Sequence, residues 1–304
     1  MRQSGGASGK RSGGKLGRAP AGKAPKEISY SFSARSLAGR AFIRSVENVT
    51  GRPRLLRMAD GYEHEVAAGR DFWEVMQERY RVQLDFIGPG LNAIPSEGPL
   101  VMVANHPYGI LDGLTMGWML SKARGEFKII AHTVFKKAKD LDQVILPIDF
   151  AETKEAQRVN IATRKAALAW LADGGCIGIF PGGTVSTSAK PFSRPMDPPW
   201  KTFTARMIAK SKATVVPVFF DGCNSRLFQL ASHINQTLRT ALFINEFDRG
   251  VKEPLRVRVG EALPRAEIDA RAGDAKALMD YLREETYRLS PKPLKDTSYG
   301  LYLG

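Results

Sequence analysis

The chain has 304 residues, of which 45 are Lys or Arg and 31 are Asp or Glu, so its formal net charge is +14. Hydrophobic residues make up 43% and charged residues 25%, which excludes a wholly disordered chain and a fibrous repeat. Two Cys are too few for a disulfide scaffold, and the four His lack the spacing of a metal site. We therefore expect a globular protein that works without a metal or other cofactor.

The positive charge is concentrated at the N-terminus. Residues 1–58 carry 13 Lys or Arg against two Glu, whereas the other 246 residues carry 32 against 29. Residues 1–27 lack aromatic side chains and predict a disordered basic arm. An anionic membrane surface is the expected partner of this end. The nearly neutral body predicts no specific nucleic-acid partner, because it lacks a basic recognition face.

The location of the protein follows from two absences in the sequence. No stretch reaches the roughly 18 apolar residues of a membrane-spanning helix, and the N-terminus lacks the apolar core of a signal peptide. We expect a cytoplasmic protein that lies on the inner face of the cell membrane.

Residues 28–81 predict a helical extension. The segment 33–49 is amphipathic, with Arg40 and Arg44 away from an apolar side formed by Leu37, Ala38, Ala41, Phe42 and Val46. A basic amphipathic helix suits an anionic lipid surface, and it equally suits docking on the main domain with its Arg in water. Residues 61–80 predict a further helix with a packing role.

Residues 82–290 alternate between strand and helix patterns, followed by a tail at 291–304. Strands are expected at 82–86, 100–104, 127–131, 144–148, 176–180 and 214–219, with edge strands at 241–245 and 255–259. Helices are expected at about 112–122, 152–172, 199–211 and 274–289. This order predicts an α/β fold with a mixed, largely parallel sheet flanked by helices.

Two predicted strands end in polar residues, at the edge of the sheet where such folds bind ligands. Asn105 and His106 follow the strand at 100–104, and Asp112 comes six positions after the His. An Asp beside a His fixes its tautomer and stabilises the imidazolium, as in a serine-protease triad. A histidine satisfied in a turn, with Asp112 capping the next helix, fits the same pattern.

The second strand exit reads Phe180-Pro181-Gly182-Gly183-Thr184. The two Gly expose backbone N–H groups that suit an anion, but the segment lacks the Gly-Lys-Ser/Thr of a nucleotide-binding loop. Taken alone, this segment is explained better by an ordinary glycine turn.

Taken in order, these segments resemble the glycerolipid acyltransferases, the superfamily of lysophosphatidate and glycerol-3-phosphate acyltransferases. The resemblance covers about residues 82–262. It is carried by the blocks already quoted, by 145–149 (Ile-Leu-Pro-Ile-Asp), by 215–218 (Val-Val-Pro-Val) and by the lead-in at 94–99.

Three departures from the family's blocks bear on the acceptor. Five residues instead of four separate His106 from Asp112, Gly182 replaces the usual Glu, and Phe150 replaces an Arg. In the family that Glu and Arg are associated with the glycerol-phosphate end of the acceptor. Their absence favours a different acceptor, such as a lyso-aminolipid like lyso-ornithine lipid. Three cations are candidates to replace the lost Arg: Arg158, Arg164 and Lys190.

The resemblance implies direct acyl transfer from acyl-CoA or acyl carrier protein to the hydroxyl of a lysolipid. His106 would be the general base and Asp112 would orient it, while Asn105, Gly182, Gly183 and Thr184 would contact substrate. Thr184 or backbone N–H groups would stabilise the oxyanion. His132 is open to two interpretations, a structural residue or a wall of the acceptor site. A non-catalytic lipid-binding or membrane-tethering protein on the same fold is the alternative, favoured if the imidazole and carboxylate prove far apart.

Overall fold

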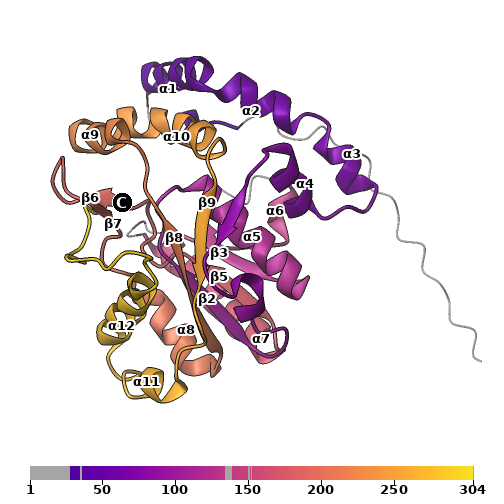
Figure 1. Ribbon diagram of the computed structural model, residues 1–304, viewed down its shortest axis with the longest axis vertical. Coiled ribbons are helices and arrows are strands. Elements are labelled where there is room, and N and C mark those ends of the chain that lie inside the picture. Colours follow the sequence, from indigo (N-terminus) through magenta and orange to yellow (C-terminus); the bar gives the residue numbers. More distant parts are fainter. Residues whose placement is uncertain (1–27, 35, 134–138, 150, 152, 304) are drawn as a thin grey trace, which may run out of the picture.

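The protein is built around a seven-stranded sheet with helices on both faces (Figure 1). The computed structural model describes residues 28–34, 36–133, 139–149, 151 and 153–303. The predicted basic arm at 1–27 and Phe150 lie outside these residues. Strand order is β1-β9-β8-β2-β5-β3-β4, and every neighbouring pair is parallel except β8 and β9. The expected mixed, largely parallel sheet is confirmed.

The strands of the main sheet are β1 (Leu84–Phe86), β2 (Leu100–Ala104), β3 (Lys128–His132), β4 (Ile145–Ile148), β5 (Cys176–Ile179), β8 (Thr214–Asp221) and β9 (Leu255–Val259). A separate antiparallel pair consists of β6 (Thr187–Ser188) and β7 (Pro195–Met196).

The helices before β5 are α1 (Leu37–Thr50), α2 (Arg52–Ala59), α3 (Tyr62–Ala67), α4 (Phe72–Arg79), α5 (Ile110–Arg124), α6 (Lys139–Asp142) and α7 (Lys154–Ala172). Those after it are α8 (Phe203–Ser211), α9 (Arg226–Ile234), α10 (Gln236–Gly250), α11 (Arg265–Asp269) and α12 (Ala275–Arg288).

The alternation of side chains along each strand divides the core into two layers. In β2, Leu100 and Met102 face a cluster that includes residues of α4, α5 and α10. Val101 and Val103 face the other cluster, which includes residues of α7, α8 and α12. Both faces of the central strands are therefore buried, which explains why these strands read as continuous apolar runs.

Helix α1 docks on α10 and still keeps apolar side chains in water. Ile43 and Glu47 are buried, whereas Leu37 is 82% and Phe42 46% exposed. The helix therefore packs on the main domain, as one of the two interpretations of the sequence expected, and contact with a lipid surface stays a prediction.

Three details of the expected secondary structure were wrong. Residues 241–245 belong to α10. A short apolar run fits a strand or a helix, and here Ala241, Ile244 and Phe247 form one buried side of the helix. The strand at 255–259 exists, but it lies between β1 and β8 and not at an edge. The single helix over 61–80 is two helices, α3 and α4, separated at Gly69, whose φ is +95°.

Within the described residues, no helix has the length and apolar character needed to cross a membrane.

Candidate active site

His106 and Asp112 meet although five residues separate them. His106 Nδ1 lies 3.1 Å from Asp112 Oδ2. The extra residue is absorbed in the turn before α5, where Gly109 has φ of +79° and precedes the helix as its N-cap. Asp112 sits in the first turn of α5, and its Oδ2 accepts hydrogen bonds from the backbone N–H of Tyr108 (2.8 Å) and of Gly109 (3.0 Å). The carboxylate is thus both helix cap and imidazole partner.

The electrostatics of this pair depend on burial. The Asp112 side chain is fully buried, and burial raises the pKa of its carboxyl, while the nearby His106 and the hydrogen bonds from the backbone of Tyr108 and Gly109 oppose that shift. Although Nδ1 of His106 lies 3.1 Å from Oδ2, the two atoms do not have the alignment of a hydrogen bond. Bonds between catalytic groups are commonly misaligned in the free enzyme. The separation lies within the reach that a catalytic pair requires, which disfavours the non-catalytic alternative.

The second block lies against the first because β2 and β5 are neighbouring parallel strands. The Phe180 ring stacks on the imidazole of His106, with centroids 4.2 Å apart and planes inclined by 28°. The backbone N–H of Ser186 donates to the carbonyl of His106 at 2.8 Å. The two strand exits therefore form one site.

A buried carboxylate, Asp197, ties these segments together. Its Oδ1 accepts hydrogen bonds from the backbone N–H of His106 at 3.2 Å and from the hydroxyl of Ser186, and its Oδ2 accepts one from Trp200 Nε1 at 2.9 Å. Asp197 is completely buried. It fixes the backbone that carries the imidazole, a role that no sequence motif indicated.

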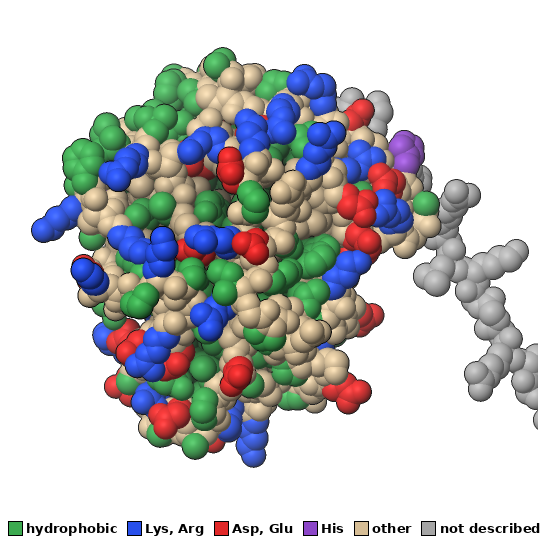
Figure 2. Space-filling view, in the orientation of Figure 1, with side chains coloured by type: hydrophobic (Ala, Val, Ile, Leu, Met, Phe, Trp, Pro, Cys, Tyr) green, Lys and Arg blue, Asp and Glu red, His purple; other side chains and the backbone are tan. Residues whose placement is uncertain are grey.

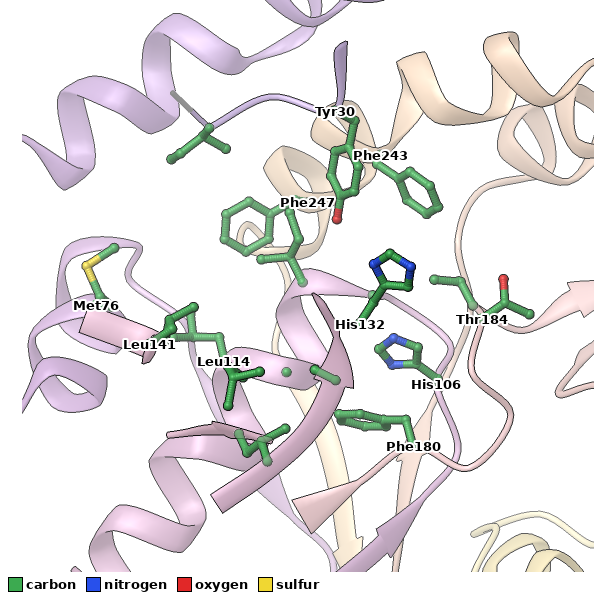
Figure 3. A pocket seen from close by; sticks show the side chains of 18 of the residues that line it. Tyr30, Met76, His106, Leu114, His132, Leu141, Phe180, Thr184, Phe243 and Phe247 are labelled. Atoms are coloured by element: carbon green, nitrogen blue, oxygen red, sulfur yellow. The ribbon is translucent and has the colours of Figure 1, made fainter. Parts of the chain in front are cut away.

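A cavity of about 900 Å³ opens beside His106, and its wall is largely apolar. Figure 3 shows His106 lying on Phe180 with His132 close by, and Tyr30 and Phe243 approaching from the far side. The apolar lining comes from α4, α5, β3, α6, α10 and the segment before α1, and includes Trp73, Met76, Leu114, Ile129, Leu141 and Phe247. Its size is within the range of ligand-binding pockets.

The N-terminal segment closes part of this cavity. Tyr30 lines it, and its ring lies 4.8 Å from that of Phe243. The segment is held by the buried Glu47, whose carboxylate accepts hydrogen bonds from Ser29 Oγ and from the backbone N–H of Tyr30, each at 2.6 Å. Residues before α1 are thus part of the site, which their composition did not indicate.

The structure places some of the predicted substrate-binding residues at the cavity and others away from it. Gly183 and Thr184 line the cavity. The amide of Asn105 instead bridges to both backbone groups of Phe220, at 2.9 and 2.8 Å, and so joins β2 to β8. Gly182 is buried against Asp197 and lies outside the cavity wall.

The three candidate cations also differ in position. Arg158 lies on the exposed face of α7, and Lys190 is exposed in the loop between β6 and β7. Arg164 is closer to the site, because its guanidinium carbon lies 5.0 Å from the ring centre of Phe203, which lines a second, smaller cavity.

Behind Thr184 lies a buried cation that sequence reasoning missed. Arg239 of α10 is 1% exposed and donates to the hydroxyls of Thr187 (2.7 Å), Ser232 (2.8 Å) and Thr184 (3.4 Å). Burial lowers the pKa of its guanidinium to about 10. Arg239 holds the segment 184–187 in place. Because 241–245 was assigned to a strand, the helix that buries Arg239 was not anticipated.

Comparison with known proteins places this chain in a family. The family model described as Acyltransferase matches residues 60–294. The chain belongs to this acyltransferase family. The protein is therefore an acyltransferase, and the predicted relationship to the glycerolipid acyltransferases is confirmed.

Two curated proteins are similar to this acyltransferase. A lyso-glycine lipid O-acyltransferase of Bacteroides thetaiotaomicron is 25% identical over 229 residues, which cover 73% of this chain and 80% of the relative. An enzyme of the same name from Phocaeicola vulgatus is 27% identical over 172 residues, covering 56% and 58%. The crystal structure of the 1-acyl-sn-glycerophosphate acyltransferase PlsC of Thermotoga maritima aligns over 87% of both chains, with 14% identity and a TM-score of 0.45.

Proposed function

We propose that this acyltransferase transfers a fatty acyl group from a thioester donor to the hydroxyl of a lysolipid. The observation that carries the proposal is the pairing of His106 and Asp112, 3.1 Å apart, at an apolar cavity of about 900 Å³. An imidazole held by a carboxylate is a general base, and a cavity of this character accepts a hydrocarbon chain.

The proposed reaction needs no covalent enzyme intermediate. Asp112 holds Nδ1 of His106, and the opposite ring nitrogen, Nε2, removes the proton from the acceptor hydroxyl. The hydroxyl oxygen attacks the thioester carbonyl, a C–O bond forms, and the C–S bond breaks. The departing thiolate takes the proton back from His106, so the enzyme ends the cycle unchanged.

Charge that develops on the carbonyl oxygen needs hydrogen-bond donors nearby. Thr184 supplies a hydroxyl at the cavity wall, held from behind by Arg239. Phe180, stacked on His106, keeps the imidazole plane fixed and excludes water from one of its faces. The donor, acyl-CoA or acyl carrier protein, delivers its thioester to this point.

The proposed acceptor is a lysolipid with an amino-acid head group. Both curated relatives are named for a lyso-glycine lipid, and the chain has Gly182 where the glycerolipid pattern has a Glu. Neither cavity has an Arg among its described lining residues to hold a glycerol phosphate. These observations support a compact amino-acid head group over a glycerol phosphate.

The proposed membrane face lies over α1 and α9, where Figure 2 shows apolar side chains beside Lys and Arg. The exposed apolar residues of this region are Phe32, Leu37, Phe42, Val49, Leu227 and Ile234. Arg40 and Arg226 are exposed on the same two helices. Apolar side chains mixed with cations suit the surface of an anionic bilayer, and the arm at 1–27 adds seven more cations. We place the protein on the inner, cytoplasmic face of the cell membrane.

A panel assay tests the substrate class. The purified protein is incubated with acyl-CoA or with acyl carrier protein and with lysolipids that carry glycine, ornithine or glycerol-phosphate head groups, and products are identified by mass. The proposal predicts acylation of an amino-acid lysolipid in preference to lysophosphatidate. Preferential acylation of lysophosphatidate would refute the acceptor class, and acylation of none would refute the proposed activity.

A further inference from the structure

The hairpin formed by β6 and β7 carries an exposed tip, residues 189–194, which the proposed reaction does not use. A tight turn holds this hairpin tip. The backbone N–H of Ser193 donates to the carbonyl of Lys190 at 3.0 Å, and Ser193 Oγ accepts from the backbone N–H of Lys190 at 3.0 Å. Pro191 and Phe192 occupy the two central positions, and Pro suits the first because its ring fixes φ. The turn therefore presents Phe192 outward in a defined geometry.

The hairpin tip combines an apolar ring with positive charge. Phe192 is 76% exposed, and the exposed Lys190 and Arg194 lie on either side of it in the sequence. Neither cation forms an ion pair with an acidic residue in the part of the chain that the structure describes, and residues 174–196 contain no Asp or Glu. An aromatic ring between two cations suits the boundary of an anionic bilayer, where the ring meets acyl chains and the cations meet phosphates.

The hairpin packs against α9, a helix of the proposed membrane face. The backbone N–H of Ser188, the last residue of β6, donates to Gln229 Oε1 at 3.0 Å, and Ser188 Oγ lies 3.3 Å from Nε2 of His233. Figure 1 shows the loop between β6 and β7 beside α9. Leu227 and Ile234, which are seven positions apart and so share one side of α9, are both exposed. The hairpin tip therefore extends the apolar and basic surface of α9.

The base of the hairpin is fixed to the active site. Thr187 of β6 pairs with Met196 of β7, and Arg239 donates to the Thr187 hydroxyl at 2.7 Å. The residue that follows β7 is Asp197, whose carboxylate accepts from the backbone N–H of His106. Because both strands are held by groups that also hold the site, a hairpin tip seated in a surface sets the orientation of the site toward that surface.

The opening of the large cavity is marked by the exposed residues of its wall. These include Phe32, which belongs to the proposed membrane face, and Gly183, which precedes β6 by four residues. A bilayer that contacts both the hairpin tip and Phe32 therefore lies at this opening.

We infer that the hairpin tip inserts Phe192 into the lipid bilayer, with Lys190 and Arg194 at anionic head groups, and so turns the cavity toward lysolipids in that bilayer. The inference rests on the proposed membrane association and names the element that sets its orientation. A protein donor, the acyl carrier protein, is the competing occupant of this surface. The apolar residues that continue along α9 favour a lipid surface over a protein partner.

The first test measures binding of full-length protein to vesicles of phosphatidylcholine and phosphatidylglycerol, by sedimentation and without donor or acceptor. High salt is used, because it weakens the electrostatic attraction of the basic arm. Phe192→Ser should bind about tenfold more weakly than wild type, since this is the contribution of burying a Phe side chain. Ile161→Ser is the matched control and should bind like wild type, because Ile161 is equally apolar and exposed but lies on α7.

The second test measures insertion directly, with vesicles whose acyl chains carry bromine, a quencher of Trp fluorescence. These vesicles should quench Phe192→Trp more than wild type, whose native Trp residues give the background. Ile161→Trp should show no quenching beyond that background.

The outcomes separate the inference from its alternatives. Unchanged vesicle binding by Phe192→Ser, or equal quenching of Phe192→Trp and wild type, would overturn the inference. Loss of binding to acyl carrier protein with vesicle binding intact would assign the surface to the donor. Insertion of the hairpin tip without any acyl transfer would support the inference and refute the proposed activity, whereas acyl transfer by a protein whose hairpin tip stays in water would refute the inference alone.

Discussion

If the proposed acyl chain lies in the large cavity, we predict that the size of the side chain at position 113 limits the chain length that is accepted. Gly113 lies on α5 in the cavity wall, and a Cβ built on it meets no atom within 4 Å. Replacing Gly113 with Leu therefore places a branched side chain in empty space inside the cavity. The helix itself should gain stability, because Gly in a helix interior costs about 1 kcal/mol relative to Ala.

The expected effect on kcat/KM follows from the cavity space that the Leu side chain fills. A Leu side chain displaces roughly three methylenes of a bound chain, and each buried methylene contributes about 0.8 kcal/mol. The loss is about 2.4 kcal/mol, or about fiftyfold in kcat/KM for the longest chains that wild type accepts. Chains about three carbons shorter should react as before. Gly113→Ala, which adds one carbon, is the graded control.

The assay measures kcat/KM across a series of saturated acyl donors, with thermal unfolding to verify that each variant is folded. An unchanged chain-length profile in a folded Gly113→Leu protein would show that the acyl chain does not lie in this cavity.

Three further predictions concern the dyad, its support and the N-terminal arm. Asp112→Asn keeps the shape of the buried side chain but removes the charge that holds the imidazole, and kcat should fall by about 10²–10⁴-fold in a steady-state assay; activity within a few-fold of wild type would contradict the orienting role. Asp197→Asn places an amide among the donors of His106, Ser186 and Trp200 and should lower the free energy of unfolding by about 1–3 kcal/mol in urea titrations; an unchanged midpoint would show that Asp197 does not support the site. Deletion of residues 1–27 removes seven Lys or Arg and should weaken binding to anionic vesicles, with a smaller salt dependence than the full chain; equal binding of both forms would exclude the arm as an anchor. Deleting all of 1–58 is a poorer test, because Tyr30 lines the cavity and Leu55 lies in the core.

The sequence predicted the sheet well because its central strands are buried on both faces. Such strands appear as short apolar runs between turns, as at 100–104 and 176–180, and these became β2 and β5. The run at 241–245 looks the same over five residues. The helical spacing becomes visible only when the run is extended to Phe247, which is buried on the same side of α10.

The part of the site that follows the ends of strands was predictable from the sequence. His106, Gly183 and Thr184 follow neighbouring parallel strands, and their proximity follows from that topology. The distance between His106 and Asp112 was not predictable, since it depends on the left-handed backbone of Gly109.

Other residues of the site were hidden because their roles depend on long-range packing. Tyr30, for example, reaches the cavity from the N-terminal segment held by Glu47. Such contacts leave no periodic pattern in the local sequence.

The most direct test of the central claim is transfer of a labelled acyl group to a lyso-glycine lipid by wild type and by His106→Asn. The control is His64→Asn, because His64 is exposed on α3, outside both cavities. Circular dichroism and thermal unfolding establish that the three proteins are equally folded. We predict acylated product of the expected mass from wild type and the control, and none above background from His106→Asn. Product formed by His106→Asn at the wild-type rate would contradict the account.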